Sequence, residues 1–356
     1  MLKKIDVDLN KRLSKDQALD LIQNATLLDL ANMASAKKAE LHPEKITTFI
    51  VDRNINYTNV CWVDCKFCAF YRHKKDDDSY VLKFDEIDEK IEELLDIGGT
   101  QILFQGGVHP NLKIDYYEDL VEHINKKYPQ ITIHGFSSIE IDFIAKASKI
   151  SILEVLQRLQ AKGLSSVPGA GAEILSDRVR DIIAPKKLDT KEWLEVHRLA
   201  HNIGMKTTAT MMFGTVETDK EIIEHWDLIR NLQDETNGFR AFIMWSFQGE
   251  NTKLIKEYDI KPQSSNRYLR LLAVARLYLD NFANLQSSWV TQGSHIGQLS
   301  LKFGANDLGS TMMEENVVKA AGASNRMNQE EMIRLIKDID EIPAKRDTAY
   351  NIIERY

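Results

Sequence analysis

The three cysteines of this 356-residue chain lie within eight positions, at Cys61, Cys65 and Cys68. The segment from residue 56 to residue 71 reads NYTNVCWVDCKFCAFY. Three thiolates this close in sequence can hold an iron–sulfur cluster, but a closed [4Fe–4S] site uses four cysteine ligands. One iron would therefore stay open to a small molecule, which would give the motif a chemical role.

Other uses of the three thiols are open from the residues alone. A disulfide would leave one cysteine over, and a structural zinc site would need a fourth ligand, such as His73. The three could also be buried structural cysteines, although those would be expected to scatter through the chain. The clustering and the C-x3-C-x2-C spacing favour an iron–sulfur cluster over zinc and over a structural role.

Composition narrows the class of protein. Hydrophobic residues make up 43% of the chain, which supports a sizeable core, and the formal net charge is −7. With no basic stretch, this charge argues against nucleic acid as a partner. The first residues lack the apolar run of a signal peptide, and no stretch approaches the ~20 apolar residues of a membrane span. We therefore expect a cytoplasmic protein without a membrane span, in a reducing compartment that suits free thiols.

Short β-branched segments alternate with amphipathic segments along most of the chain, which predicts βα units and a parallel sheet. We predict an α/β fold, a (β/α)8-type TIM barrel, full or near full, with N- and C-terminal helical extensions. The expected domains are an N-terminal extension at 1–45, the barrel at 46–312 and a C-terminal extension at 313–356. Strands are expected at 46–51, 55–60, 101–105, 131–136, 165–170, 206–213, 239–247 and 283–290, and the longer helices at 85–97, 116–127, 139–161, 189–202, 219–232, 266–282 and 328–337.

The cysteine spacing resembles that of the radical S-adenosylmethionine (SAM) superfamily, C-x3-C-x-aromatic-C, with Phe67 at the aromatic position. The resemblance implies that Cys61, Cys65 and Cys68 bind three irons of a [4Fe–4S] cluster, and that SAM chelates the fourth. It further implies that one electron from the cluster cleaves SAM to a 5′-deoxyadenosyl radical. An electron donor such as a flavodoxin or ferredoxin would then be a partner.

Three glycine turns follow expected strands, and two of them, at Gly106-Gly107 and at Gly214, resemble SAM-binding turns of the superfamily. Gly106 and Gly107 match the glycine pair that approaches the SAM amino group, although Val108 stands where many members carry Glu. Glu173 could bond the ribose or the amino group of SAM, and Gly214 lies in a turn expected near the adenine. The alternatives are ordinary βα turns for the glycines and a helix start at Glu173.

The polar segment after the last expected strand, residues 291–315, is a good place for substrate contacts. His295, Asp307 and Glu314 are our candidates for a catalytic general base. The alternative for Glu314 is a helix-capping role. A substrate carboxylate would need a cation, for which Arg240 or Lys302 are candidates.

Longer motifs resemble one branch of the superfamily. NYTNV before the first cysteine, QGGVHP at 105–110 and SHIGQLSLKFGANDLGSTMMEE at 294–315 are similar to deazaflavin (F0) synthase, aminofutalosine synthase and, most of all, the dehypoxanthine futalosine cyclases. The resemblance implies a radical cyclisation of dehypoxanthine futalosine in menaquinone biosynthesis. The C4′ hydrogen of the substrate would be abstracted and the carbon radical would add to the benzoate ring. F0 synthase-type or aminofutalosine synthase-type chemistry is the alternative, a zinc-dependent barrel hydrolase is a remote one, and a non-enzymatic cluster carrier is another.

Overall fold

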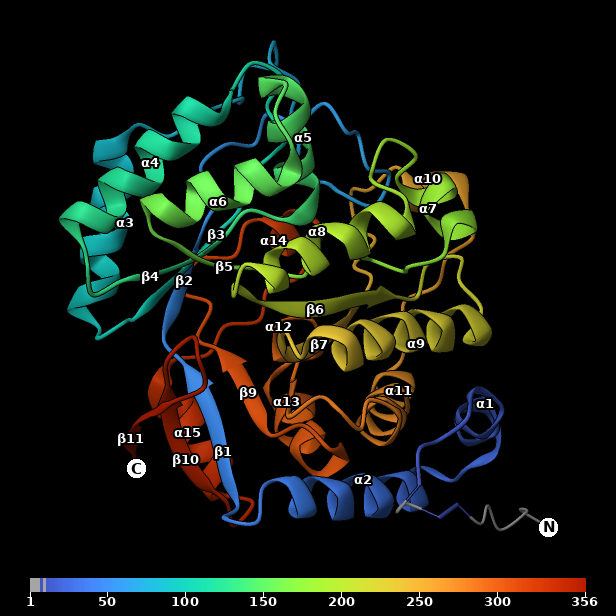
Figure 1. Cartoon of the computed structure of the whole chain (residues 1–356). Coiled ribbons are helices and arrows are strands. Elements are labelled where there is room, and N and C mark those ends of the chain that lie inside the picture. The colour runs from blue at the N-terminus through green and yellow to red at the C-terminus, as the bar shows by residue number, and fades with distance from the viewer. Residues whose placement is uncertain (1–6, 9–10) are drawn as a thin grey trace.

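In the computed structural model, which describes residues 7–8 and 11–356, eleven strands pair into one curled sheet with helices on its outer side (Figure 1). The strands lie in the order β11-β10-β1-β9-β8-β7-β6-β5-β4-β3-β2, and only β10 and β11 pair antiparallel. Their bounds are β1 Ile46–Ile50, β2 Asp52–Ile55, β3 Gln101–Phe104, β4 Thr132–Gly135, β5 Leu164–Val167, β6 Lys206–Phe213, β7 Phe239–Ser246, β8 Asn284–Gln286, β9 Asp307–Ser310, β10 Ile342–Arg346 and β11 Ile352–Arg355.

The curled sheet turns back on itself, so that β9 pairs with β1. Strands β1 and β2 are separated only by Val51, and β1 pairs with β9 while β2 pairs with β3. The backbone N–H of Thr311, just after β9, donates to the carbonyl of Ile50. The architecture is thus a curled, open sheet, a partial TIM barrel, and the predicted α/β barrel-type fold is confirmed.

Helices cover the outside of the sheet and begin at side chains that satisfy their free N–H groups. Asp189 and Thr218 form capping boxes with the glutamates three residues later and start α8 and α9. The helices are α1 Lys15–Asn24, α2 Leu27–Leu41, α3 Phe84–Asp96, α4 Ile114–Lys127, α5 Ser138–Ser148, α6 Ile152–Lys162, α7 Asp177–Ile183, α8 Thr190–Asn202, α9 Asp219–Thr236, α10 Leu254–Glu257, α11 Ser265–Tyr278, α12 Trp289–Gln292, α13 Ser294–Ser300, η1 Leu301–Phe303, α14 Val317–Ala320 and α15 Gln329–Lys337.

Several elements differ from the sequence-based expectation. The helix expected at 139–161 is two helices, because Lys149 adopts a left-handed conformation and Ser151 caps α6. Strand β9 lies inside the polar segment 291–315, where no strand was expected. The segment 313–356 contains β10 and β11 as well as α14 and α15. The expected extension at 1–45 contains α1 and α2, and its residues 1–6 and 9–10 lie outside the described part.

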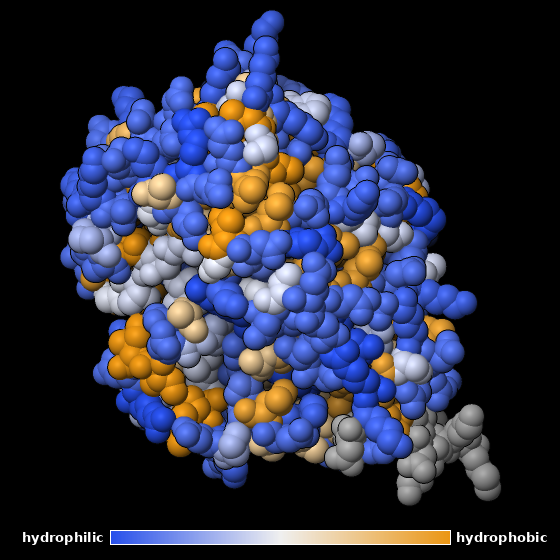
Figure 2. Space-filling model, viewed as in Figure 1, coloured by the Kyte–Doolittle hydropathy of each residue, from blue (hydrophilic) through white to orange (hydrophobic). Residues whose placement is uncertain are grey.

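The apolar core lies mainly between the sheet and its helices. Among the largest fully buried side chains are Trp193 on α8 and Trp226 on α9, and both helices contact β6. The face of the molecule in Figure 2 is mostly hydrophilic, with scattered apolar areas. In the described ranges, no helix is both long enough and apolar enough to cross a membrane. The inside of the barrel contains a cavity.

Candidate active site

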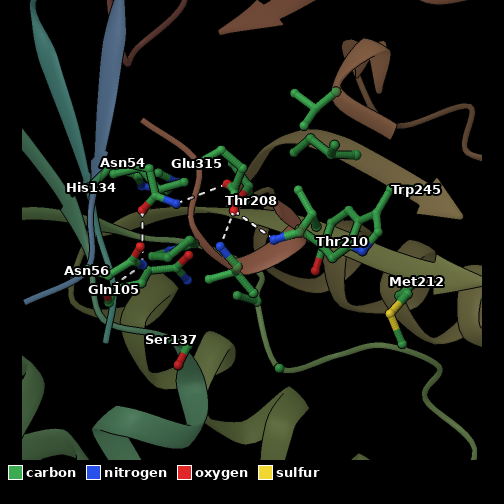
Figure 3. A pocket seen from close by; sticks show the side chains of 18 of the residues that line it. Asn54, Asn56, Gln105, His134, Ser137, Thr208, Thr210, Met212, Trp245 and Glu315 are labelled. Carbon is green, nitrogen blue, oxygen red and sulfur yellow. Dashed lines mark hydrogen bonds between the residues drawn. The ribbon is translucent and has the colours of Figure 1, made fainter. Parts of the chain in front are cut away.

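The cavity, of about 410 Å³, lies inside the barrel and is lined by residues of β1 to β10. Its size falls within the range that is usual for small-molecule sites. All three cysteines line it at the end where the parallel strands finish, which is where barrel enzymes place their chemistry. The polar wall formed by Asn54, Asn56 and Gln105 is seen in Figure 3.

The cysteines sit on a loop that runs from β2 to α3. Cys65 is buried, and Cys61 and Cys68 are half-buried. The loop is shaped by backbone hydrogen bonds from Cys61 N–H to Arg72 O (2.9 Å) and from Cys68 N–H to Cys65 O (3.1 Å). Burial raises the pKa of all three thiols. Thiolates in such a site depend on a bound metal for their charge, because metal ligation deprotonates a cysteine.

His73 is not placed to act as the fourth ligand of a zinc ion. Its side chain is 55% exposed and its Nε2 lies 3.5 Å from Asp64. In the part of the chain that the structure describes, no group of three or more His, Cys, Asp or Glu side chains converges as ligands of one metal ion. A four-iron cluster does not require such convergence, because each cysteine binds a different iron.

The glycine turn after β3 packs directly on the cysteine loop. A Cβ at Gly107 would lie 2.3 Å from the carbonyl oxygen of Val60, the residue before Cys61. The N–H of Gly107 donates to Thr58 O (2.8 Å), and that of Gly106 donates to the carboxylate of Glu140 (3.0 Å). An ammonium group is only a hydrogen-bond donor, so at this turn it would be bound through carbonyl oxygens.

Glu173 supplies an unsatisfied acceptor to the same cavity. Its Oε1 accepts from Lys187 Nζ, while its Oε2 is buried without a hydrogen-bond partner. Lys187 Nζ also lies 4.9 Å from the ring centre of Phe67, which lines the cavity beside the cysteines. A buried carboxylate oxygen without a donor is costly. The three thiols and this acceptor, side by side, fit a cluster with an amino or hydroxyl group bound next to it.

The structure does not bring four of the other predicted residues to this cavity. Gly214 closes a turn, since its N–H and that of Thr215 donate to Glu217. His295 lies exposed on α13. Asp307 is fully buried in an ion pair with Arg346, and Glu314 pairs with Arg53 and Lys90. None of Gly214, His295, Asp307 and Glu314 lines the cavity.

Carboxylates that the sequence analysis passed over do line it: Asp52, Glu140 and Glu315. Asp52 accepts from Gln101 Nε2 (2.8 Å) and from the Ser310 hydroxyl. Glu140 accepts from Tyr57 Oη (2.6 Å), the Ser137 hydroxyl (2.6 Å) and two backbone N–H groups.

Glu315 is held against β2 and the start of α14. It accepts from Asn54 Nδ2 (3.0 Å) and from the N–H groups of Val317 (2.7 Å) and Val318 (3.0 Å). A sequence signal for this wall exists, because Asp52, Asn54 and Asn56 alternate through β2 and the residue after it. Polar residues at a period of two place three polar side chains on the inner face of a barrel strand.

Comparison with known families agrees with this site. Residues 55–229 match the radical SAM superfamily, and residues 236–355 match the CofH/MqnC C-terminal region. The chain belongs to the radical SAM superfamily, in the branch that carries the CofH/MqnC C-terminal region.

Two relatives and one solved structure are similar to nearly the whole chain. It is 44% identical to the cyclic dehypoxanthine futalosine synthase of Halalkalibacterium halodurans, over 97% of this chain and 93% of that one. It is 40% identical to the 5-amino-6-(D-ribitylamino)uracil--L-tyrosine 4-hydroxyphenyl transferase of Archaeoglobus fulgidus, over 94% and 96%. The crystal structure of methylornithine synthase (PylB) shares the fold, with a TM-score of 0.72, 15% identity and coverage of 94% of this chain and 95% of that one. The protein is therefore a radical SAM enzyme, similar to cyclic dehypoxanthine futalosine synthase.

Proposed function

We propose that the protein cyclises dehypoxanthine futalosine, in menaquinone biosynthesis, by radical SAM chemistry with electrons from a flavodoxin or ferredoxin. The observation that carries the proposal is that Cys61, Cys65 and Cys68 line one end of a barrel cavity together with the unsatisfied carboxylate of Glu173. The 44% identity to a cyclic dehypoxanthine futalosine synthase along nearly the whole chain supports this substrate.

The cluster and SAM, when bound, supply a 5′-deoxyadenosyl radical that removes one hydrogen atom. Cys61, Cys65 and Cys68 would hold the cluster, and Glu173 would orient the SAM amino or ribose group. The barrel walls would exclude water and hold the C4′ hydrogen and the benzoate ring in position, which is the main requirement of a reaction with one hydrogen and one ring carbon. The protein also has to remove one proton when the ring regains its aromaticity.

We propose that Glu315 accepts this proton as the general base, in place of His295, Asp307 or Glu314. Glu140 already accepts four hydrogen bonds, and Glu173, which is paired with Lys187, is assigned to SAM. Asp52 lies two residues below Asn54 on β2, about 7 Å deeper at ~3.3 Å per residue. Of the two remaining carboxylates, Glu315, bonded to Asn54, thus lies nearer the cysteine end.

The test is an anaerobic assay of the reconstituted protein with SAM, a reductant and dehypoxanthine futalosine. We expect 5′-deoxyadenosine and a product lighter than the substrate by two hydrogens, one lost as an atom and one as a proton. The electron released in the second loss returns to the cluster or its donor. The Cys65→Ala variant should form neither product, and turnover by that variant would refute the cluster role of the cysteines.

A second candidate function is supported by the 40% identity to the Archaeoglobus fulgidus transferase. In this case the enzyme would join a tyrosine-derived fragment to 5-amino-6-(D-ribitylamino)uracil. The same protein preparation, offered L-tyrosine and this uracil, distinguishes the two functions by product mass. Conversion of the tyrosine pair, with no conversion of dehypoxanthine futalosine, would replace the first function by the second.

A further inference from the structure

The basic side chains that line the cavity differ in whether they have a counter-ion. Three lysines and arginines line it: Lys187, Arg240 and Arg346. Lys187 is paired with Glu173, and Arg346 is paired with Asp307. Arg240 forms no ion pair within residues 7–8 and 11–356.

The guanidinium of Arg240 is also poor in hydrogen bonds. Its one side-chain hydrogen bond runs from Nη1 to the carbonyl of Thr348, at 3.3 Å, although a guanidinium has five donors. Asp347 is an acidic neighbour that acts through space, but its oxygens accept from the N–H groups of Ala349 and Asn351 and from the Asn351 side chain. A half-buried cation with unused planar donors is suited to bind a carboxylate in a bidentate manner.

The position of Arg240 makes the two ends of the cavity differ in charge. It is the second residue of β7, so it lies toward the inner end, away from the carboxyl ends of the strands. Around that end are Tyr350, Thr348 and His134. The pKa of His134 is lowered to about 3 by burial and by the charges of Arg240 and Arg346, so its imidazole is neutral. The carboxylates of Glu140 and Glu173 lie with the glycine turn and the cysteines instead, whereas Asp52, deeper on β2, accepts hydrogen bonds from Gln101 and Ser310.

We propose that Arg240 binds the carboxylate of the substrate's aromatic acid at the inner end of the cavity. This inference rests on the proposed function and names the residue that selects and orients that substrate. Carboxylates at the cysteine end would repel an anionic benzoate, and the unpaired guanidinium would attract it. The substrate then has one favoured orientation, with its sugar toward the cysteines and its carboxylate toward Arg240.

Lys302, the other cation considered from the sequence, provides a matched control. Its Nζ donates to Ile339 O (2.9 Å) and pairs with Glu341 (3.2 Å), and it does not line the cavity. Arg346 is a poor alternative because its Nε and Nη2 donate to Asp307 and its Nη1 donates to Asp347 O (3.1 Å). Substitutions of Arg240, Lys302 and Arg346 are thus expected to affect the binding of the same ligand differently.

The test is equilibrium binding of dehypoxanthine futalosine and of its methyl ester to the protein carrying cluster and SAM, without reductant. The wild type should bind the acid at least about tenfold more tightly than the ester, since hydrogen bonds to charged groups contribute ~1.5–3 kcal/mol. Arg240→Gln should bind the acid at least about tenfold more weakly than the wild type does, and it should bind acid and ester equally. Lys302→Gln should behave as the wild type.

Two outcomes would overturn the assignment: equal binding of acid and ester by the wild type, or an undiminished preference for the acid in Arg240→Gln. An Arg240→Lys variant, which keeps the charge, should recover part of the preference and excludes simple misfolding. Failure of the proposed function looks different. In that case the wild type forms no cyclised product, whereas failure of the Arg240 assignment leaves cyclisation intact and removes only the discrimination between acid and ester.

Discussion

The two oxygens of the Glu173 carboxylate have different surroundings. One accepts from Lys187 and the other is buried without a partner beside the cysteine loop. We predict that Glu173→Gln weakens SAM binding by about tenfold or more, because the amide loses the charge that attracts an ammonium group. Equilibrium SAM binding to the anaerobically reconstituted protein measures this. Glu217→Gln, at the Gly214 turn outside the cavity, is the comparison, and equal affinity in both variants would contradict a role for Glu173.

Asp52 makes the stability of the protein depend on pH. Burial raises its pKa to about 6 from the ordinary 3.8, although hydrogen bonds from Ser310 and Gln101 oppose the shift. The folded state then keeps a proton that the unfolded state loses between about pH 4 and 6. Stability contributed by the protonated group is present below pH 4 and is lost as the pH rises through 6, a change of ~3 kcal/mol for a shift of about two units.

The corresponding prediction concerns Asp52→Asn, which removes the titration. Its free energy of unfolding, relative to the wild type, should rise by up to ~3 kcal/mol between pH 4 and pH 7. Urea unfolding of both proteins at several pH values across this range provides the measurement. A constant difference between variant and wild type at every pH would show that Asp52 does not titrate in this range.

At the residue scale, the sequence indicated the three cysteines of the cavity but not its inner wall. Three cysteines within eight positions are suited to few roles besides cluster ligation, and the structure brings all three to the cavity. The general-base candidates were harder, because Glu314 and Glu315 are adjacent and point to different partners. Only the backbone after β9 decides that Glu315 lines the cavity while Glu314 pairs with Lys90.

The turn after β3 and the cysteine loop behave as one packed unit. Since a Cβ at Gly107 would lie 2.3 Å from Val60 O, Gly107→Ala must displace the backbone that leads into Cys61. We predict that this variant loses most of its iron and its SAM cleavage while its circular dichroism stays close to that of the wild type. Iron and sulfide analysis after reconstitution checks this. Gly204→Ala is the control, because its φ of +82° strains the backbone locally while a Cβ there meets no atom within 4 Å, so it should lower stability without loss of iron.

The break between α5 and α6 allows a prediction about stability. Lys149 adopts φ +58°, which a residue with a Cβ occupies at a cost of ~1 kcal/mol or more. Lys149→Gly should therefore raise the free energy of unfolding by up to ~1 kcal/mol. Glu224→Gly, at an exposed position inside α9, should lower it by a similar amount. Denaturant unfolding of both variants measures the two signs, and destabilisation by Lys149→Gly would contradict a conformational cost at this position.

At the element scale, the alternation of strands and helices was predictable, and the exceptions have physical causes. The helix expected at 139–161 has continuous helical periodicity, so a lysine in a left-handed conformation gives no signal in the sequence. Strand β9 has the sequence Asp-Leu-Gly-Ser, which lacks the β-branched residues that indicate a strand. It is a strand because tertiary contacts satisfy its polar side chains.

For the whole molecule, the joint between the barrel and its last strands is a buried ion pair. Asp307 on β9 and Arg346 on β10 are buried, and the carboxylate also accepts from the Thr48 hydroxyl on β1. Three strands that are far apart in the sequence, β1, β9 and β10, thus meet at one carboxylate. The alternative function of Asp307 as a catalytic base has less support here, because its oxygens are occupied by Arg346 and Thr48 and it does not line the cavity.

This pair predicts a pattern of stability that separates a structural role from a catalytic one. Arg346→Met should lower the free energy of unfolding by ~3–5 kcal/mol, because it leaves the Asp307 carboxylate buried without its counter-ion. The double variant Asp307→Asn/Arg346→Met should recover a large part of this loss, since it removes the unpaired charge. Urea unfolding of the wild type, both single variants and the double variant gives the coupling energy directly. A double variant whose loss equals the sum of the two single losses would mean that the two side chains stabilise the barrel independently, and that β10 is held to β1 and β9 by its backbone hydrogen bonds and apolar contacts alone.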